Sequence, residues 1–426
     1  MGQRLELVAA LRAAEDASPV DAVAAVTREL GASAGATEVS FLIADLSGRA
    51  LVRLAHEPLQ GGPLADTDGT SERRRGEEAA VVLPFDGGPR EQAVRTQDVV
   101  LLEPCDDHLW TLLAPVTERG ESIGLLEMRL PKRPDPASVE GISRLAHLLA
   151  FVVIANRRHT DLFEWGQRSR PLSLSAEIQQ RLLPGPRTCE AGAFTLAGWL
   201  EPAADIAGDT FDYSLGRDSL HLSMTDAMGH GVEAALTATL CLGGLRGARR
   251  QGATLLGQAA STNEALSRHA ESSALDDFVT GIIGHLDLRT GALDLVNAGH
   301  VPPYLVRDGE VATVRLPVDV PLGLFRTSEY RSTRVGLEHG DRLVIVTDGM
   351  LERRAAAIDL PAALLRTRSL HPREAVRALA DSALEATGHA LSDDATVMCL
   401  DWYGHHGRDR ASVSGADRSR ASEPLR

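Results

Sequence analysis

Aromatic residues and cysteines are scarce in this sequence. Phe, Trp and Tyr make up 4% of the 426 residues, and the four cysteines never occur as a Cys-x-x-Cys pair. A disulfide framework or a structural zinc site needs paired, closely spaced cysteines. The scattered cysteines instead indicate reduced thiols, so we expect a cytoplasmic protein.

Basic residues and long apolar runs are also in short supply. Lys and Arg number 44 against 59 Asp and Glu, which gives a formal net charge of −15. A phosphate-backbone partner requires a basic face, so this balance argues against nucleic-acid binding. The longest apolar run, residues 145–155, contains His147 and is shorter than the roughly 20 residues that cross a bilayer. No apolar signal core follows Met1. We therefore expect no nucleic-acid partner and no membrane span.

The composition is otherwise typical of a globular protein. Hydrophobic residues make up 43% and charged residues 24% of a chain long enough for two ordinary domains. The pattern predicts an N-terminal helical segment (1–19), a first domain (20–157), a helical linker (158–185), a second domain (186–403) and a disordered tail (404–426) rich in Arg, Ser, Asp and Gly.

The first domain is expected to contain a helix, antiparallel strands, a Gly-, Asp- and Arg-rich loop over residues 60–76, a hairpin and a closing helix. This order resembles a GAF sensor domain, and the hairpin of residues 110–116 and 123–126 matches best. The resemblance implies a domain that binds a small molecule or a protein, or that packs as a dimer module. The alternative is an α+β spacer without a ligand. Cys105 and His108 are isolated and are interpreted as packing or surface residues.

The closing helix of the first domain, residues 138–157, has an apolar stripe that includes Leu145, Leu149 and Val152. Such a stripe packs on its own domain or along a two-fold partner, and a two-fold dimer is the commonest closed assembly. We therefore expect a homodimer.

A further helix is predicted just before the second domain. Leu174, Ile178 and Leu182 share one face, Ser173 or Ser175 caps the start, and Pro184 stops the helix. The connection to the first domain has little Gly or Ser, so it is expected to be stiff. One hypothesis is that this helix transmits the state of the sensor domain. The alternative is an ordinary connecting helix.

The second domain reads as hairpins with helices inserted in pairs. This order predicts a layered α+β fold with antiparallel sheets, not a doubly wound parallel sheet.

Four short acidic stretches in the second half of the chain stand next to strand-like runs. They are Ala207-Gly208-Asp209, Asp226 to Gly231, Thr347-Asp348-Gly349 and Ser392 to Thr396. Oxygen ligands without paired His or Cys suit hard cations such as Mg²⁺ or Mn²⁺. Two such ions held by shared carboxylates can activate a water for attack on phosphorus. The residues therefore predict a two-metal phosphoprotein phosphatase.

The ordered set of motifs resembles a known family over residues 173–403. The matching stretches are Leu174 to Pro184, Gly208-Asp209, Asp212-Tyr213, Asp226, Gly229-His230-Gly231, Ala234-Ala235, Asn297 to His300, Pro302-Pro303, Pro321-Leu322-Gly323, Thr347 to Gly349, Glu352 and Asp393 to Val397. Together they resemble the SpoIIE-type branch of the metal-dependent, protein phosphatase 2C-like (PPM) family. The resemblance implies an antiparallel β-sandwich flanked by helices, with metals at one end.

The same resemblance implies the roles of individual residues. Asp226 is expected to bridge two Mn²⁺ or Mg²⁺ ions. Asp209 and the Ala227 carbonyl are expected to hold the second ion, and Asp348 and Asp394 the first. We call Asp209, Asp226, Asp348 and Asp394 the four aspartates. They are the expected catalytic residues, and the implied reaction is attack of a metal-activated water on phosphoserine or phosphothreonine.

The resemblance further implies a phosphorylated anti-sigma-factor antagonist as substrate, in a bacterial partner-switching pathway. The alternative function is a catalytically silent scaffold that keeps the fold and binds a partner protein. Ala207 and the pair Thr210-Phe211 depart from the family pattern without removing a ligand. His230 and His300 are interpreted as structural residues rather than general acids.

Overall fold

The computed structural model of the chain describes residues 2–56, 72–75, 78–104, 108–202, 208–273, 277–351, 359–388, 391 and 393–406. The chain divides into two compact units, with the boundary between Pro171 and Leu172. This boundary falls inside the predicted linker, 158–185. Helix α5 (Leu162–Gly166) belongs to the first unit and helix α6 (Leu174–Leu182) to the second.

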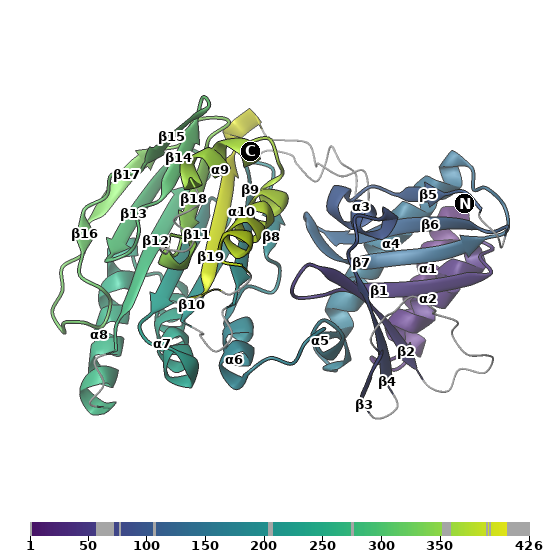
Figure 1. Cartoon of the computed structure of the whole chain (residues 1–426), viewed down its shortest axis with the longest axis horizontal. Coiled ribbons are helices and arrows are strands. Elements are labelled where there is room, and N and C mark those ends of the chain that lie inside the picture. Colours follow the sequence, from purple (N-terminus) through teal and green to yellow (C-terminus); the bar gives the residue numbers. More distant parts are fainter. Residues whose placement is uncertain are drawn as a thin grey trace. The chain divides into compact units, whose positions relative to one another are not determined.

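The first unit is built on a seven-stranded antiparallel sheet in the order β3-β4-β2-β1-β7-β6-β5 (Figure 1). Its strands are β1 (Glu38–Ala44), β2 (Ala50–His56), β3 (Glu72–Arg75), β4 (Glu78–Pro84), β5 (Val100–Leu102), β6 (Trp110–Glu118) and β7 (Glu121–Leu130). Strand β3 corrects the prediction of a loop over residues 60–76. Its four residues are all charged, and pairing with β4 makes them an edge strand. Residues 60–71, 76 and Cys105 lie outside the described residues.

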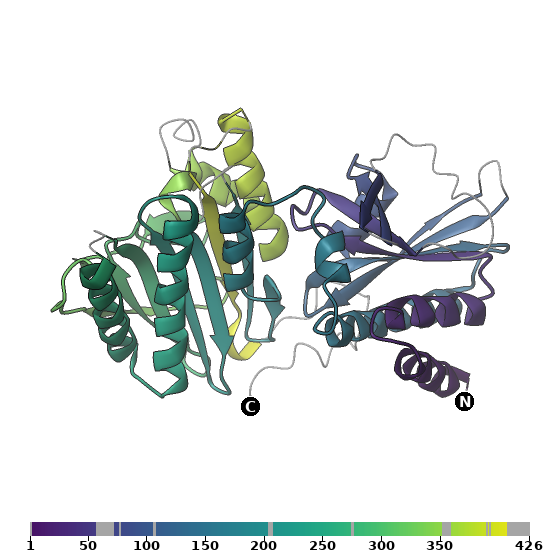
Figure 2. The same cartoon turned by 90° about the horizontal axis from the view of Figure 1, so that it is seen from below.

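Helices cover both faces of this sheet. Helices α1 (Gly2–Asp16), α2 (Ala22–Ser33) and α4 (Pro136–Asn156) lie on one face (Figure 2), and α3 (Pro89–Thr96) lies on the other. Side chains of β1 alternate between the two cores, because successive residues of a strand point to opposite faces. Phe41 and Ile43 pack with α2 and α4, whereas Leu42 packs on the α3 side.

Helix α4 contains the apolar run of residues 145–155. By length and composition alone it could cross a membrane, and it is the one such helix among the residues described. Ala146, Leu149 and Val153 are buried in the core of their own unit. A core helix of a globular domain has the same length and composition, so this feature does not by itself indicate a membrane span.

The second unit contains two six-stranded sheets (Figure 1). The first comprises β10 (Asp209–Leu215), β11 (Ser219–Ala227), β12 (Val279–Asp287), β13 (Ala292–Ala298), β16 (Val318–Asp319) and β17 (Ser332–Gly336). The second comprises β15 (Glu310–Thr313), β14 (Tyr304–Arg307), β18 (Arg342–Val346), β19 (Ala395–Trp402), β9 (Phe194–Glu201) and β8 (Thr188–Glu190). All pairings are antiparallel except the short parallel pair of β13 and β16.

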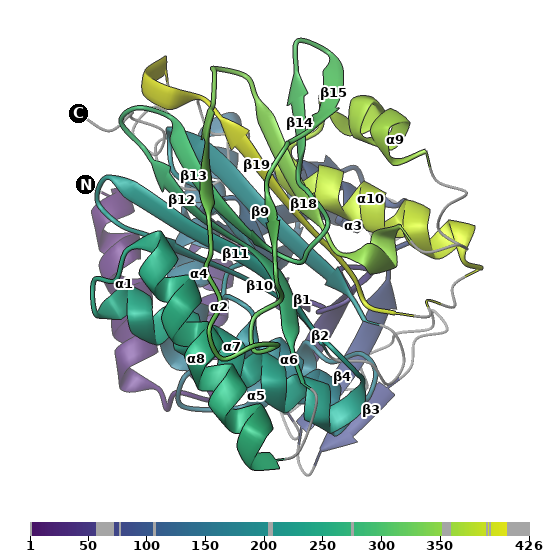
Figure 3. The same ribbon diagram turned by 90° about the vertical axis from the view of Figure 1, so that its left-hand side faces the viewer.

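The two sheets of the second unit pack face to face with helices outside. Leu222 and Met224 of β11 share one apolar cluster with Ile345 of β18 and Leu400 of β19. Helices α7 (Gly231–Arg250) and α8 (Leu255–Ser273) cover the first sheet, and α9 (Leu360–Thr367) and α10 (Pro372–Ala386) cover the second (Figure 3). The predicted α+β class with antiparallel sheets is confirmed.

The end of the second unit differs slightly from the prediction. Gly404–His406, at the start of the predicted disordered tail, form a short 3-10 helix. The Gly404 amide donates to the carbonyl of Ala193 at 3.0 Å, which holds this turn against the strand β9 region. Residues 407–426 lie outside the described residues.

Candidate metal centre

The sheet register brings the first two of the four aspartates together. Asp209 is the first residue of β10, and Asp226 stands directly opposite it on β11. Both therefore lie at the same end of the first sheet. Strand β11 continues to Ala227, so Asp226 is the next-to-last residue of the strand.

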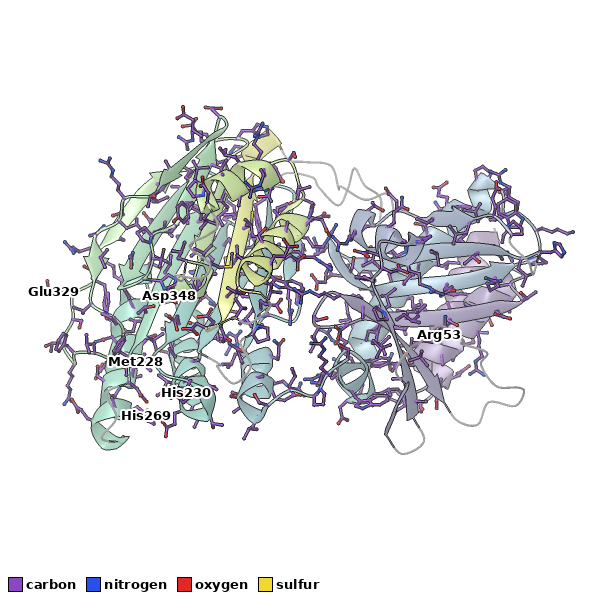
Figure 4. All side chains as sticks on the ribbon, in the orientation of Figure 1. Arg53, Met228, His230, His269, Glu329 and Asp348 are labelled. Carbon is purple, nitrogen blue, oxygen red and sulfur yellow. The ribbon has the colours of Figure 1, made fainter. Side chains whose placement is uncertain are left out.

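The other two aspartates lie at the ends of neighbouring strands of the second sheet. Asp348 opens the 3-10 helix η1 (Asp348–Met350) just after β18, and Asp394 directly precedes β19. Because β18 and β19 pair in antiparallel fashion, with Val346 opposite Val397, these ends meet. In Figure 4, Asp348 lies at the same end of the second unit as Met228, which follows β11. The structure thus collects the four aspartates from both sheets at one end of the sandwich.

Asp209 is buried and held by two threonines. Its Oδ2 accepts hydrogen bonds from the hydroxyls of Thr347, at 2.7 Å, and Thr396, at 2.6 Å. Burial raises the pKa of Asp209 well above its usual value, and the carboxylates of Asp226 and Asp394 raise it further. The two threonine hydrogen bonds oppose this shift only in part. Each threonine is one or two residues from another of the four aspartates, so one small network orients three strand ends.

The pKa of Asp226 is raised by the same two causes, burial and neighbouring negative charge. Burial, followed by the charges of Asp348, Asp393 and Asp394, raises the pKa of Asp226 to about 7. Several carboxylates this close cannot all be ionised at neutral pH unless a cation offsets their repulsion. An all-oxygen donor set of this charge fits Mg²⁺ or Mn²⁺.

The side chains are neighbours but do not form a finished coordination sphere. Among the residues that the structure describes, no three His, Cys, Asp or Glu side chains are already arranged so that they could hold a metal ion. Oδ2 of Asp209 and Oδ2 of Asp394 both accept hydrogen bonds from the protein. Ion binding at this site is therefore a proposal.

Two glycines permit the close backbone approach on which the site depends. A β-carbon on Gly208 would lie 2.5 Å from the carbonyl oxygen of Ala227, the expected backbone ligand. A β-carbon on Gly349 would collide with the carbonyl oxygen of Asp394. Only glycine fits at these two positions, because any side chain would push the ligand-bearing strands apart. Ala207, the departure noted beside Gly208, lies outside the described residues.

One residue of the site was missed in the sequence. Gln179 of α6 is fully buried, and its Nε2 donates to Oδ2 of Asp394, at 2.6 Å, and to the carbonyl oxygen of Asp209, at 2.9 Å. The structure buries Ser175, Ala176 and Gln179 of this helix, whereas Leu174, one of the three residues expected to share an apolar face, is 66% exposed. Ser173 caps the helix, as expected, through a bond from the Ala176 amide.

The second aspartate of the Gly208–Tyr213 stretch has a structural role. Asp212 is buried and forms ion pairs with Arg246 and Arg249 of α7, at 2.9 and 3.2 Å. Arg246 also donates to the carbonyl oxygen of Leu182, at 2.7 Å, where α6 ends. The motif therefore fastens β10, α6 and α7 to one another beside the four aspartates.

The two histidines occupy different surroundings. His230 is exposed at the start of α7 and forms no side-chain cap. His300 is buried, and burial lowers its pKa to about 4, so it is neutral at pH 7. Its Nδ1 lies 2.9 Å from the Thr280 hydroxyl, and Asn297 hydrogen-bonds both its amide and its carbonyl. This geometry favours the structural interpretation of His300 and Asn297.

Comparison with known proteins points to one family. The family model described as Stage II sporulation protein E (SpoIIE) matches residues 216–403. Phosphoserine phosphatase RsbP of Bacillus subtilis is 25% identical over 243 residues, 54% of this chain and 58% of that protein. Phosphoserine phosphatase RsbU of Bacillus subtilis is 22% identical over 235 residues, 54% of this chain and 69% of that protein. The match thus covers little more than half of this chain and of RsbP.

Among solved structures, the RsbU and RsbW domains of Rv1364c from Mycobacterium tuberculosis are similar to the chain. The sequence identity is 26% and the TM-score is 0.42, over 51% of this chain and 62% of the other.

Proposed function

We propose that this chain, whose residues 216–403 belong to the SpoIIE family of PP2C-like phosphatase domains, is a metal-dependent protein phosphatase for phosphoserine or phosphothreonine. The observation that carries the proposal is the meeting of the four aspartates at one end of two sheets. The pKa of Asp226, raised to about 7 by burial and neighbouring carboxylates, supports a site built for cations. The naming of two relatives as phosphoserine phosphatases supports the reaction class.

The proposed ligand roles are those that the family resemblance implies. Asp226 would bridge two Mn²⁺ or Mg²⁺ ions, Asp209 and the Ala227 carbonyl would hold one of them, and Asp348 and Asp394 would hold the other. When bound, the ions would supply an activated water and offset the charge of the phosphoryl group.

The chain's own residues would prepare this site. Thr347 and Thr396 fix one oxygen of Asp209, which leaves its other oxygen for an ion. A proton must leave Asp226 before the carboxylate can bind an ion, so binding is expected to release protons near neutral pH.

The substrate we infer is a cytoplasmic phosphoprotein, a phosphorylated anti-sigma-factor antagonist of a partner-switching pathway. The basis is the similarity to RsbP and RsbU together with the family resemblance. The competing function is a silent scaffold that only binds a partner. The complete set of four aspartates favours the phosphatase, because a scaffold would not need their mutual repulsion.

The first unit is proposed as the regulatory part. Residues 20–157 would be a GAF-like domain that senses a small molecule or a protein, in a chain that forms a homodimer; the α4 stripe predicted as a possible dimer contact packs on its own unit, where Leu149 and Val152 are buried. The signal would reach the metal centre through α6. The hydrogen bonds from Gln179 to Asp209 and Asp394 support this route, since a shift of the helix would move two ligand positions.

The proposal is tested with the purified full chain and phosphorylated candidate antagonists, in Mn²⁺ and in chelator. Turnover is expected in Mn²⁺ and is expected to disappear with chelator. Asp226→Asn should lower turnover at least about 1,000-fold, because both ions lose a charged ligand. Asp218→Asn, an exposed aspartate of the same hairpin, is the control and should retain activity. Chelator-insensitive turnover, or an active Asp226→Asn variant, would refute the metal centre.

A further inference from the structure

The N-terminal half of α7 carries large apolar side chains on its outward face. Val232, Leu236 and Leu240 are 40%, 54% and 37% exposed. Their four-residue spacing places them on one stripe of the helix. The opposite side of α7, with Ala238 and Cys241, is buried against the first sheet and α8. The stripe is thus an apolar surface that the second unit does not bury.

In the C-terminal half of α7, the same face carries glycines instead of large side chains. Gly243 and Gly247, three and seven residues after Leu240, lie on the same face of the helix, and a β-carbon on either would meet no atom within 4 Å. The adjacent Gly244 differs, because its β-carbon would lie 3.0 Å from the Thr262 hydroxyl of α8. Packing against α8 therefore accounts for Gly244 only. Since glycine weakens a helix relative to alanine, Gly243 and Gly247 are best explained by an outside surface that approaches closely.

We propose that this face of α7 pairs with α7 of a second copy of the chain, in antiparallel direction. A two-fold axis between residues 241 and 242 places Leu240 opposite Gly243 of the second copy, and Leu236 opposite its Gly247. Each leucine side chain of one helix then packs into the space above a glycine of the other helix, so the two identical surfaces are complementary in shape. This shape match commits the surface to a second copy rather than to an unrelated protein.

The charges agree with the same register. Glu233 and Arg250 are both exposed near opposite ends of α7. In the antiparallel pair, Glu233 stands opposite Arg250 of the second copy at each end of the contact. A parallel pair would instead set leucine against leucine and Glu233 against Glu233, which is worse in both size and charge.

The pairing would fix the distance between the two metal centres of the dimer, whether or not these centres are active. Helix α7 begins at Gly231, shortly after Asp226, and Figure 4 shows His230 at this start. At a rise of about 1.5 Å per residue, the two starts of α7 would lie about 30 Å apart along the pair. The dimer would hold its two sites at a set spacing along this pair.

Disulfide trapping of the full chain tests the register. Leu236→Cys and Gly247→Cys are made separately in a Cys105→Ser background, in which the three remaining cysteines are buried. The two variants are mixed, allowed to exchange and mildly oxidised. We expect a covalent dimer that joins the two substituted positions, identified by mass spectrometry. Each variant alone should not cross-link, because like positions would lie about 16 Å apart along the helices, beyond the reach of a disulfide.

Two further variants make the result decisive. Leu256→Cys of α8 is 40% exposed but lies off the stripe, so its mixture with Gly247→Cys should give at least ten times less cross-link. Adding Gly243→Leu to both partners fills the hollow and should lower the cross-link at least tenfold. No cross-link in the first mixture, equal yield with the α8 control, insensitivity to Gly243→Leu, or cross-linking of Leu236→Cys with itself would each overturn the antiparallel pair.

Discussion

Replacement of Gln179 by methionine tests how the metal centre is held together. Methionine has a similar length and no branching, so it removes the two hydrogen bonds with little change in volume. The lost bonds are those to Oδ2 of Asp394, at 2.6 Å, and to the carbonyl of Asp209, at 2.9 Å. Both ligand positions would then lose a buried donor that now orients them.

The structure sets the size of the expected effect. A hydrogen bond to a charged acceptor contributes about 1.5–3 kcal/mol, and one to a neutral carbonyl contributes about 1 kcal/mol. Only the bond to Asp394 acts directly on a ligand side chain. Its loss should weaken Mn²⁺ binding by about 10- to 150-fold, since about 1.4 kcal/mol corresponds to a factor of ten. Partners of metal ligands commonly have effects of this size.

The assay is a Mn²⁺ titration of the full chain, followed by calorimetry and by turnover. The half-saturating Mn²⁺ concentration should rise in Gln179→Met, while turnover at saturating Mn²⁺ stays within a few-fold of the original protein. Leu174→Ala, exposed on the same helix, is the matched control and should leave the titration unchanged. An unaltered or tighter Mn²⁺ affinity in Gln179→Met would refute the reasoning that Gln179 orients Asp394.

Three further predictions concern the same end of the sandwich. Burial and neighbouring carboxylates raise the pKa of Asp226 in the folded chain to about 7, so in chelator the contribution of Asp226 to stability is lost as pH rises from about 4 to about 7. The thermal unfolding temperature should therefore be higher at pH 5.5 than at pH 7.5, and Asp226→Asn should reduce this difference. The same titration predicts that Mn²⁺ affinity falls when pH drops below 7, because protons compete for the carboxylate, and calorimetry at pH 6 and 8 measures it. Gly349→Ala should destabilise the chain by about 1–3 kcal/mol through collision with the Asp394 carbonyl, whereas Gly336→Ala, with open space around it, should change urea unfolding by less than about 1 kcal/mol.

Local patterns in the sequence determined which stretches matter and what kind of structure holds them. Alternating apolar residues predicted the strand that includes Asp226, because a strand with one face in a core alternates. A continuous apolar run, Leu343 to Val346, predicted the strand before Asp348. The ordered set of four acidic stretches beside strand-like runs predicted ligands for hard cations, although each stretch alone is typical of a turn. The antiparallel α+β class followed from hairpin spacing, which is also a local property.

The tertiary structure alone decided which residues meet. The contact between Gln179 and Asp394 spans 215 residues of sequence, and no local pattern encodes such a distance. The inward face of α6 likewise depended on its neighbours: the carboxylates it covers need a donor, so Gln179 points inward while Leu174 faces solvent. The charged stretch Glu72–Arg75 became a strand only because β4 offered it a paired edge. Sequence determined the chemistry available at each strand end, whereas the packing of two sheets and α6 determined which groups share one site, because burial, charge and hydrogen bonding there depend on all of them together.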